Sequence, residues 1–273
     1  MSKSRPAFIP LLFLLSSAAA LFLSSCGVQV KNFRKDRPFV YQTNINVKGN
    51  FSRDSLDLLR SRLKSQLDDS MRSRSVSKVF FSVMKSPPVY DTSSAEKSVL
   101  YMRALLNSLG YFHDTITYKA RIDTLNNGQM RTTVDFTVAP GKVVRIDSFA
   151  YNLRDSNLQR LASTSQAEAV IKEGDPFAKS NISLELDRLV QYYRERGYMK
   201  FGRDDLYGLW DTLDISLLNP TADPFEQLLL LQKIKERREN PKANLEIRLR
   251  PITDSNKLKQ FYVGNVTIYP DYI

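Results

Sequence analysis

The side chains best suited to chemistry in this sequence are one cysteine and one histidine. Cys26 and His113 are the sole members of their residue types among 273 residues. A single cysteine forms no disulfide within the chain, and thiolate or imidazole metal sites and His-assisted nucleophiles need partners that this chain lacks. The ten glycines are scattered without the spacing of a phosphate-binding loop. We therefore expect no metal ion, no cofactor and no catalytic residue.

Two pairs of neighbouring carboxylates remain as candidates for acid–base chemistry. Asp68-Asp69 and Asp204-Asp205 each place two acids side by side in the chain. Paired carboxylates can divide the roles of acid and base between them. Adjacent acids more often belong to turns and helix surfaces, so the sequence favours a structural role for both pairs. The two pairs therefore give little support to an enzymatic function.

The position of Cys26 indicates another chemistry, the attachment of a lipid. The first five residues include a lysine and an arginine, an apolar run follows from Ala7 to Phe22, and small residues come next. This order is typical of a secretory signal peptide, and the run is short for a membrane span. Leu-Ser-Ser-Cys at 23–26 resembles the bacterial lipobox, in which the cysteine is acylated and becomes the new N-terminus. We expect residues 1–25 to be a lipoprotein signal peptide; the alternative is an ordinary signal peptide with an incidental cysteine.

The charge balance of the chain is basic. Forty Lys and Arg against 29 Asp and Glu give a net charge of +11, which becomes about +9 without the leader. Such a charge can attract nucleic acid or anionic lipid headgroups. An exported protein seldom meets nucleic acid, so the leader favours partners of the cell envelope. Hydrophobic residues make up 42% of the chain, enough for one or two domains or a string of smaller ones.

The sequence also contains an internal repeat. Three kinds of segment recur in the same order at offsets of about 90 to 120 residues. They are an extended opening (41–47, 145–151 and 262–268), a Gly–aromatic step (109–112 and 196–199) and a closing strand (133–140 and 244–251). A repeat of this kind predicts tandem modules of one architecture.

The spacing of apolar residues assigns the elements between these segments. Residues three and four apart predict a helix after Ser52 (Leu56, Leu59, Leu63, Leu67), a second helix over 99–109, a short helix over 154–161 and a longer one over 182–193. Alternation over 116–122 and 132–138 about an Asn-Asn-Gly turn predicts a hairpin. Strands near 200–209 and 245–249 flank a helical insertion at 211–240. Gly110 and Gly197, which follow the longer helices, are expected to be left-handed structural caps.

A tandem β-α-α-β-β unit with a Gly–aromatic step after its second helix resembles the POTRA domain, the periplasmic module of the BamA/TamA family of outer-membrane assembly factors. Segments 37–41, 66–70 and 108–112 look like the lipid-anchored members. The resemblance covers residues 38–273 and implies an α+β fold of small mixed sheets, each covered by two helices on one face. The implied boundaries are an anchor linker at 26–37, POTRA-like module 1 at 38–140, module 2 at 141–252 and the start of a truncated module 3 at 253–273.

The resemblance implies a lipoprotein of the outer membrane with its modules in the periplasm. It would bind unfolded barrel proteins or subunits of the assembly machinery by β-augmentation, and no nucleic acid. A lipid-anchored envelope scaffold or secretion-system tether is the alternative. Because 262–268 repeats only an opening strand, the chain is expected to continue past Ile273, with a strand docked on module 2 as the alternative. The sequence indicates neither the binding edge nor the oligomeric state.

Overall fold

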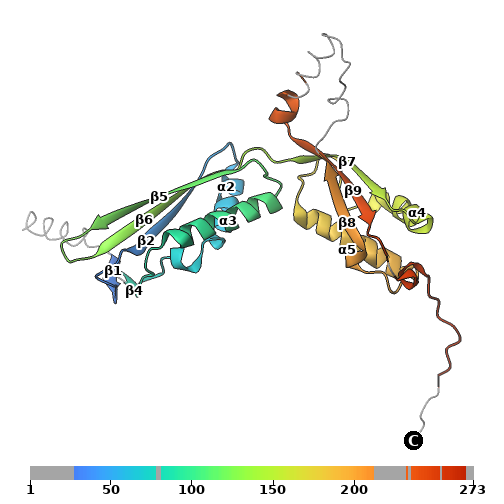
Figure 1. Cartoon of the computed structure of the whole chain (residues 1–273), viewed down its shortest axis with the longest axis horizontal. Coiled ribbons are helices and arrows are strands. Elements are labelled where there is room, and N and C mark those ends of the chain that lie inside the picture. Colours follow the sequence, from blue (N-terminus) through green and yellow to red (C-terminus); the bar gives the residue numbers. More distant parts are fainter. Residues whose placement is uncertain (1–27, 78–80, 212–231, 233–234, 253, 269–273) are drawn as a thin grey trace, which may run out of the picture. The chain divides into compact units, whose positions relative to one another are not determined.

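The computed structural model describes residues 28–77, 81–211, 232, 235–252 and 254–268 (Figure 1). The chain divides into two compact units, one of residues up to 103 with 116–139, the other of 104–115 with the residues from 140 onward. The leader with Cys26, most of the 211–240 insertion and residues 269–273 lie outside the described residues. Each unit contains a small three-stranded mixed sheet with helices, so the predicted α+β fold class is confirmed.

The first unit is built on a sheet with the strand order β2-β6-β5. These strands are Phe39–Val47, Met130–Ala139 and Thr115–Thr124. β2 and β6 run parallel, with a register irregularity between Val40 and Gln42. β5 and β6 are neighbours joined by a turn in which the Leu125 N–H donates to the Gln129 carbonyl over 2.9 Å and Gly128 has a φ of +78°. The hairpin that the sequence predicts is therefore present.

Two helices, α2 (Arg53–Ser65) and α3 (Thr92–Ser108), cover this sheet (Figure 1). Ser52 caps α2 as predicted, because its side chain accepts a hydrogen bond from the Ser55 N–H. Leu59 and Leu63 of α2 are buried, and so are Met102 and Leu106 of α3. Alternate residues of β6, Val134, Phe136 and Val138, are fully buried beneath them. The spacing of the apolar residues thus gave the correct helix faces.

A second, smaller sheet in the first unit was not predicted. It has the order β1-β4-β3, formed by Val28–Lys31, Ser82–Lys85 and Ser75–Ser77. β1 pairs parallel with β4, and β3 pairs antiparallel with β4. β1 belongs to the segment expected to be only an anchor linker. Strands of three or four mostly polar residues carry too short an alternation to be recognised in a sequence.

The second unit repeats the arrangement with the order β7-β9-β8. The strands are Arg145–Asn152, Lys242–Leu249 and Leu206–Asp211, and the helices are α4 (Ser156–Thr164) and α5 (Lys179–Glu195). β7 runs parallel to β9 and β8 antiparallel to it. One core joins all of these elements; its fully buried members include Leu158, Leu189, Tyr193, Phe201 and Ile247. The predicted repeat of β-α-α-β-β order is confirmed.

Two strand predictions in this part of the chain were wrong in detail. The strand expected near 200–209 begins only at Leu206, because residues 203–205 form a 3-10 turn held by the Asp205 side chain, which accepts the Gly202 N–H at 2.7 Å. The repeated opening at 262–268 forms no strand in the structure. Tyr262 and Val263 are 81% and 88% exposed there, and a strand without a neighbour has no ladder to join.

The Gly–aromatic steps share one geometry. Gly110 has a φ of +90° and Gly197 a φ of +94°, each two residues past the end of its helix. The carbonyl of Gly110 accepts the Val144 N–H at 2.9 Å, just before β7, and the carbonyl of Gly197 accepts the Phe261 N–H at 2.7 Å, just before the 262–268 segment. Each glycine therefore holds the start of the next opening segment of the repeat.

The core of the second unit contains a buried charge. Glu185 of α5 is fully buried and accepts hydrogen bonds from the Tyr151 hydroxyl at 2.7 Å and from the Val170 N–H at 2.8 Å. Arg188, one turn later on the same helix, contacts the carboxylate at 2.7 Å. Burial, and then the hydrogen bond to Glu185, raise the pKa of Tyr151, so its phenol stays protonated and can donate. The network joins β7, α5 and the segment at Val170.

Candidate functional site: the open sheet edges

The edges of the two sheets are the surfaces on which these units can bind another chain. An edge strand presents backbone N–H and C=O groups without partners, and an extended peptide can pair with them whatever its side chains. The strand orders place β2 and β5 at the edges of the first sheet, and β7 and β8 at the edges of the second. How far each edge is already occupied decides which of them can accept a strand.

The two opening strands are shielded where they begin. In the first unit Val40 N–H donates to the Pro88 carbonyl at 2.9 Å, and Phe39 forms an isolated bridge with Val89. In the second unit the Ile146 N–H donates to the Asp175 carbonyl at 2.9 Å. The segment before the second helix thus covers the start of the opening strand in both units. These loops carry no periodic signal, and sequence reasoning missed the contact.

β7 is also shielded at its end. The Gln159 side chain of α4 accepts the Leu153 N–H at 2.8 Å and donates to the Tyr151 carbonyl at 3.0 Å. One amide side chain therefore satisfies a donor and an acceptor at the position that an added strand would use. Only the short middle of the β7 edge remains for pairing.

β8 has an open outer edge. The Arg250 N–H donates to the Asp205 carbonyl at 2.8 Å, which makes Asp205 and Arg250 a hydrogen-bonded pair just before the strand. Such pairs alternate along an antiparallel ladder, so the backbone groups of Gly208 and Trp210 point away from β9. Within the described residues, these groups have no backbone partner on the outer side. A strand can pair there without displacing any described segment.

The side chains of β8 add apolar surface beside its free backbone. Leu209 is 41% exposed and Trp210 47% exposed. The indole of Trp210 stacks on Phe112, with ring centroids 5.2 Å apart, and lies 5.3 Å from the ring of Phe177. These contacts hold the indole in one orientation. A Cβ on Gly208 would meet Leu245 at 3.4 Å and Ile182 at 3.5 Å, so this position faces the core and the exposed apolar surface comes from its neighbours.

β5 is the equivalent strand of the first unit. It spans ten residues, of which only Ile116 is buried, and Ile122 is 49% exposed. The alternation over 116–122 predicts a buried face for this strand, but only its first apolar residue, Ile116, reaches the core. Its remaining residues form a long, exposed edge strand, which suits β-augmentation.

The free part of β2 borders a shallow groove. About 320 Å³ in volume, it is lined by Thr43, Asn44, Ile45 and Asn46 of β2 and by Arg60 and Lys64 of α2. Arg60 is paired with Asp57 at 3.1 Å. Because the start of this strand is covered, β2 offers a shorter edge than β5.

The carboxylate pairs singled out in the sequence have structural partners. Asp68 caps the 3-10 helix Asp69–Met71 by accepting the Ser70 N–H at 3.0 Å, and Asp69 pairs with Arg74 at 2.6 Å. Asp205 is buried and contacts Lys257 at 2.6 Å, whereas its neighbour Asp204 is exposed. Neither pair brings its two carboxylates into a common cavity.

Other expectations about chemical sites concern the single histidine and metal ligands. His113 is exposed, and its carbonyl lies 2.8 Å from where a Cβ on Gly141 would stand. Across the described ranges, no group of three or more His, Cys, Asp and Glu side chains is placed to hold a metal ion. In the same ranges no helix combines the length and apolar character needed to cross a membrane.

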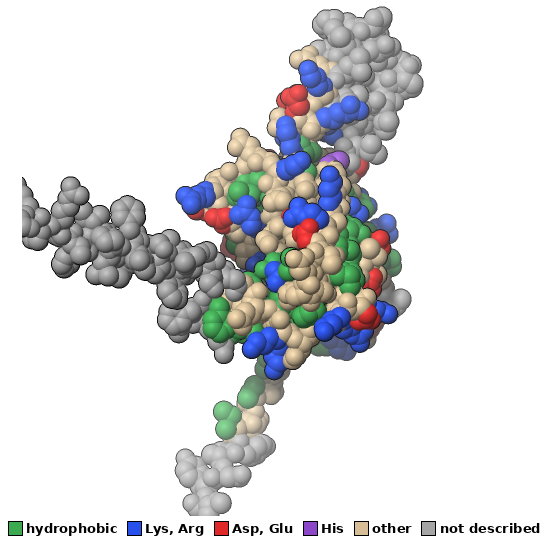
Figure 2. Space-filling model, turned by 90° about the vertical axis from the view of Figure 1, so that its left-hand side faces the viewer, with side chains coloured by type: hydrophobic (Ala, Val, Ile, Leu, Met, Phe, Trp, Pro, Cys, Tyr) green, Lys and Arg blue, Asp and Glu red, His purple; other side chains and the backbone are tan. Residues whose placement is uncertain are grey.

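The positive charge of the chain is dispersed on the face drawn in Figure 2. Lys and Arg side chains stand there among acidic, polar and apolar ones without forming a single basic patch. Net charge alone therefore marks no binding surface on that face.

Comparisons with known proteins find similarity at the level of structure. No protein-family model matches the chain, and no curated protein matches it in sequence. BamA POTRA3-5 from Haemophilus influenzae is 15% identical with a TM-score of 0.36, covering 80% of this chain and 68% of that one. BamA from Haemophilus ducreyi lacking POTRA domains 1-3 is 12% identical with a TM-score of 0.38, covering 78% and 29%. POTRA1-2 of Omp85 from Anabaena is 11% identical with a TM-score of 0.33, covering 79% and 98%. This chain thus spans less than a third of the Haemophilus ducreyi chain.

Proposed function

We propose that this chain is the periplasm-facing, lipid-anchored part of an outer-membrane protein assembly factor, and that it binds extended segments of unfolded barrel proteins or partner subunits by β-augmentation. It acts as a binding module and catalyses no reaction. The observation that carries the proposal is the open outer edge of β8, where the backbone N–H and C=O groups of Gly208 and Trp210 point away from β9. β5 of the first unit is the matching edge.

Three features support this function together. The elements of the main sheet follow the β-α-α-β-β order in each unit. The loops before α3 and α5 cover the opening strands β2 and β7 rather than β5 and β8. Backbone pairing places little demand on side chains, which suits a receptor for clients of many sequences. The predicted leader and lipobox would put the units at a bacterial envelope membrane.

Site-specific photo-crosslinking tests the choice of edge. We expect p-benzoylphenylalanine in place of Leu209 on β8 to crosslink to a ten-residue peptide of alternating apolar and polar residues. The same group in place of Ala150, an exposed residue of the shielded β7, is the matched control and should give at most weak crosslinking.

A backbone-modified peptide separates β-augmentation from side-chain binding. Methylation of every amide nitrogen removes the donors along both edges of the peptide and leaves its side chains intact, so crosslinking at position 209 should be lost. Equal crosslinking of the two peptides, or stronger crosslinking at position 150, would contradict binding by β-augmentation at β8. If position 209 captures only one folded protein in cells, the result favours the alternative function, an envelope tether, over a receptor for unfolded clients.

Lipid attachment gives a separate prediction. Cys26→Ala should release the protein from membranes or stop the processing of its leader, because the residue that would carry the lipid is gone. Firm anchoring needs more than one acyl chain, since a single chain binds only marginally. Membrane fractionation and the mass of the mature N-terminus measure the result. Ser25→Ala, beside the cysteine, is the control and should remain anchored. A Cys26→Ala protein that is processed normally and stays with outer membranes would exclude this residue as the anchor.

A further inference from the structure

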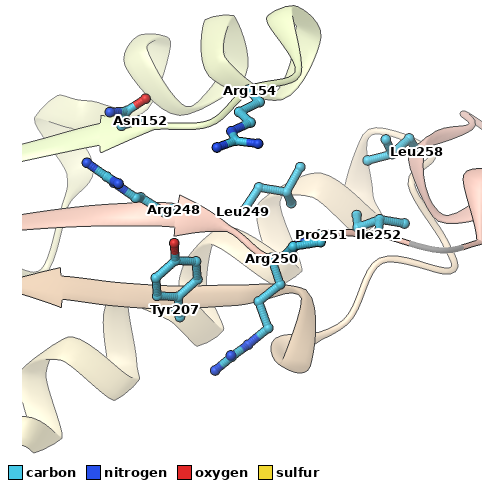
Figure 3. Close-up of a pocket in the computed structure, with 9 residues that line it drawn as sticks. All are labelled: Asn152, Arg154, Tyr207, Arg248, Leu249, Arg250, Pro251, Ile252 and Leu258. Atoms are coloured by element: carbon cyan, nitrogen blue, oxygen red, sulfur yellow. The ribbon is translucent and has the colours of Figure 1, made fainter.

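The second unit has a pocket at one end of its sheet (Figure 3). It has a volume of about 430 Å³ and lies where β7 and β9 end and β8 begins. Its polar lining comprises Asn152, Arg154, Tyr207, Arg248 and Arg250. In the close-up, the guanidinium groups of Arg154 and Arg248 turn into the space beside Asn152, while Arg250 extends on the side of Tyr207.

The positive charge of this pocket exceeds the negative charge around it. Arg248 is paired with Glu246 at 2.6 Å, and the Asn152 amide also donates to Glu246 at 3.3 Å. Arg250 has no carboxylate partner among the described residues, and its guanidinium lies 5.2 Å from the centre of the Tyr207 ring. Of the three arginines that line the pocket, only Arg248 is thus paired with a carboxylate.

Arg154 has neither a hydrogen bond nor an ion pair from its guanidinium in the described part of the chain. The neighbouring carboxylate of Asp155 does not compensate it by a contact, because Asp155 accepts the N–H groups of Asn157 and Leu158 at the start of α4. A guanidinium offers five donors in a planar fork that fits phosphate and carboxylate oxygens. Arg154 therefore stands at the pocket with its donors available to a ligand.

The other wall of the pocket is apolar. Leu249, Pro251, Ile252 and Leu258 line it, and Leu258 comes from the 3-10 helix Ser255–Leu258. A small inorganic anion would use only the arginine side. A ligand with an anionic group and a carbon chain would contact both walls.

We propose that this pocket binds a phosphate group, with Arg154 as the principal ligand, Arg248 and the Asn152 amide beside it, and Arg250 adding charge. The Arg154 guanidinium has no carboxylate partner and can donate two parallel hydrogen bonds to phosphate oxygens. Arg250, on the Tyr207 side, adds a more distant positive charge, which favours a doubly charged phosphate monoester over a singly charged carboxylate. The group belongs either to a lipid headgroup, whose glycerol and acyl carbons lie on the apolar wall, or to soluble phosphate. The site is separate from the outer edge of β8 and does not require strand binding.

Calorimetric titration of the full chain in a non-ionic detergent, at constant ionic strength, tests the assignment. The probes are inorganic phosphate, dihexanoylphosphatidic acid, dihexanoylglycerol and acetate. We expect saturable binding of at least one of the two phosphate compounds, weakened about tenfold or more by Arg154→Gln, because a charge-assisted hydrogen bond is lost. Arg160→Gln removes the same charge from an exposed position on α4 and should leave the affinity unchanged.

Each outcome decides between the sources or overturns the site. Tighter binding of phosphatidic acid than of inorganic phosphate identifies a lipid headgroup, and equal affinities identify soluble phosphate. Absence of saturable binding, equal losses in the two arginine variants, or acetate or dihexanoylglycerol binding as tightly as the phosphate compounds would each refute a phosphate site. Arg154 is exposed, so thermal unfolding of Arg154→Gln should match the parent and exclude misfolding as the cause.

Discussion

Gly110→Ala is expected to lower the free energy of unfolding of the second unit by about 3 kcal/mol. Part of this loss, about 1–2 kcal/mol, comes from a side chain at a φ of +90°. The rest comes from overpacking, since a Cβ at this position would stand 2.9 Å from the Phe177 carbonyl oxygen. That carbonyl cannot move away easily, because Phe177 is buried and its N–H is bonded to the Val144 carbonyl at 2.8 Å.

Urea unfolding followed by tryptophan fluorescence measures this loss, because Trp210, the single tryptophan, belongs to the second unit. Gly174→Ala is the matched control: its φ is +84°, yet no heavy atom lies within 4 Å of an added Cβ. It should cost about 1–2 kcal/mol, from the backbone alone. Equal losses at the two positions would show that the approach of Phe177 does not matter.

Gly197→Ala tests whether a close contact of the added Cβ always lowers the free energy of unfolding. Its added Cβ would lie 2.8 Å from the Phe261 carbonyl oxygen, as close as at Gly110. Phe261, however, is 41% exposed and precedes a segment without strand partners, so its backbone can shift. The clash should therefore displace the 262–268 segment rather than unfold the core. The two glycines look alike in the sequence and differ only in what faces them.

Helices and strands in which the apolar pattern repeats over many residues could be predicted from the sequence. Leu59 and Leu63 repeat over enough turns of α2 to identify its buried face, and the Asn-Asn-Gly turn identifies the β5–β6 hairpin. The β1-β4-β3 sheet could not, because Ser75–Ser77 has only three residues, all of them exposed, and its alternation is too short to be recognised. Its formation depends on pairing between segments far apart in the chain, which short strands do not encode locally.

Which edge strand is free could likewise not be predicted from the sequence. The sequence of β7 mixes apolar and polar residues, and that of β8, Leu-Tyr-Gly-Leu-Trp-Asp, is mostly apolar, but neither pattern shows which strand has the free edge. The difference comes from loops: the segment at Asp175 and the Gln159 side chain satisfy the outer groups of β7. Such contacts depend on how a loop folds back on the sheet. The arginine pocket was missed for the same reason, since Arg154 and Arg248 converge only through the pairing of β7 with β9.

The buried carboxylate was also missed, because Glu185 looks like a solvent-facing residue on a helix. Its removal gives the second large expected effect. Glu185→Ala should destabilise the second unit by about 3–5 kcal/mol, the usual cost of leaving one member of a buried ion pair without the other. Arg188 keeps only 19% of its side chain exposed, and the Val170 N–H and Tyr151 hydroxyl would lose their acceptor as well.

Three further variants show how that cost arises, again by urea unfolding with Trp210 fluorescence. Tyr151→Phe removes two hydrogen bonds, the one that the hydroxyl donates to Glu185 and the one that it accepts from Arg188, and should cost about 1 kcal/mol for each. Arg188→Met leaves the fully buried Glu185 without its cation, so its cost should approach that of Glu185→Ala. Replacing both Glu185 and Arg188 with Met should recover much of the loss, because neither charge is then left buried alone. If the double variant loses the sum of the two single losses, the residues act independently and the pair is not the source of the effect.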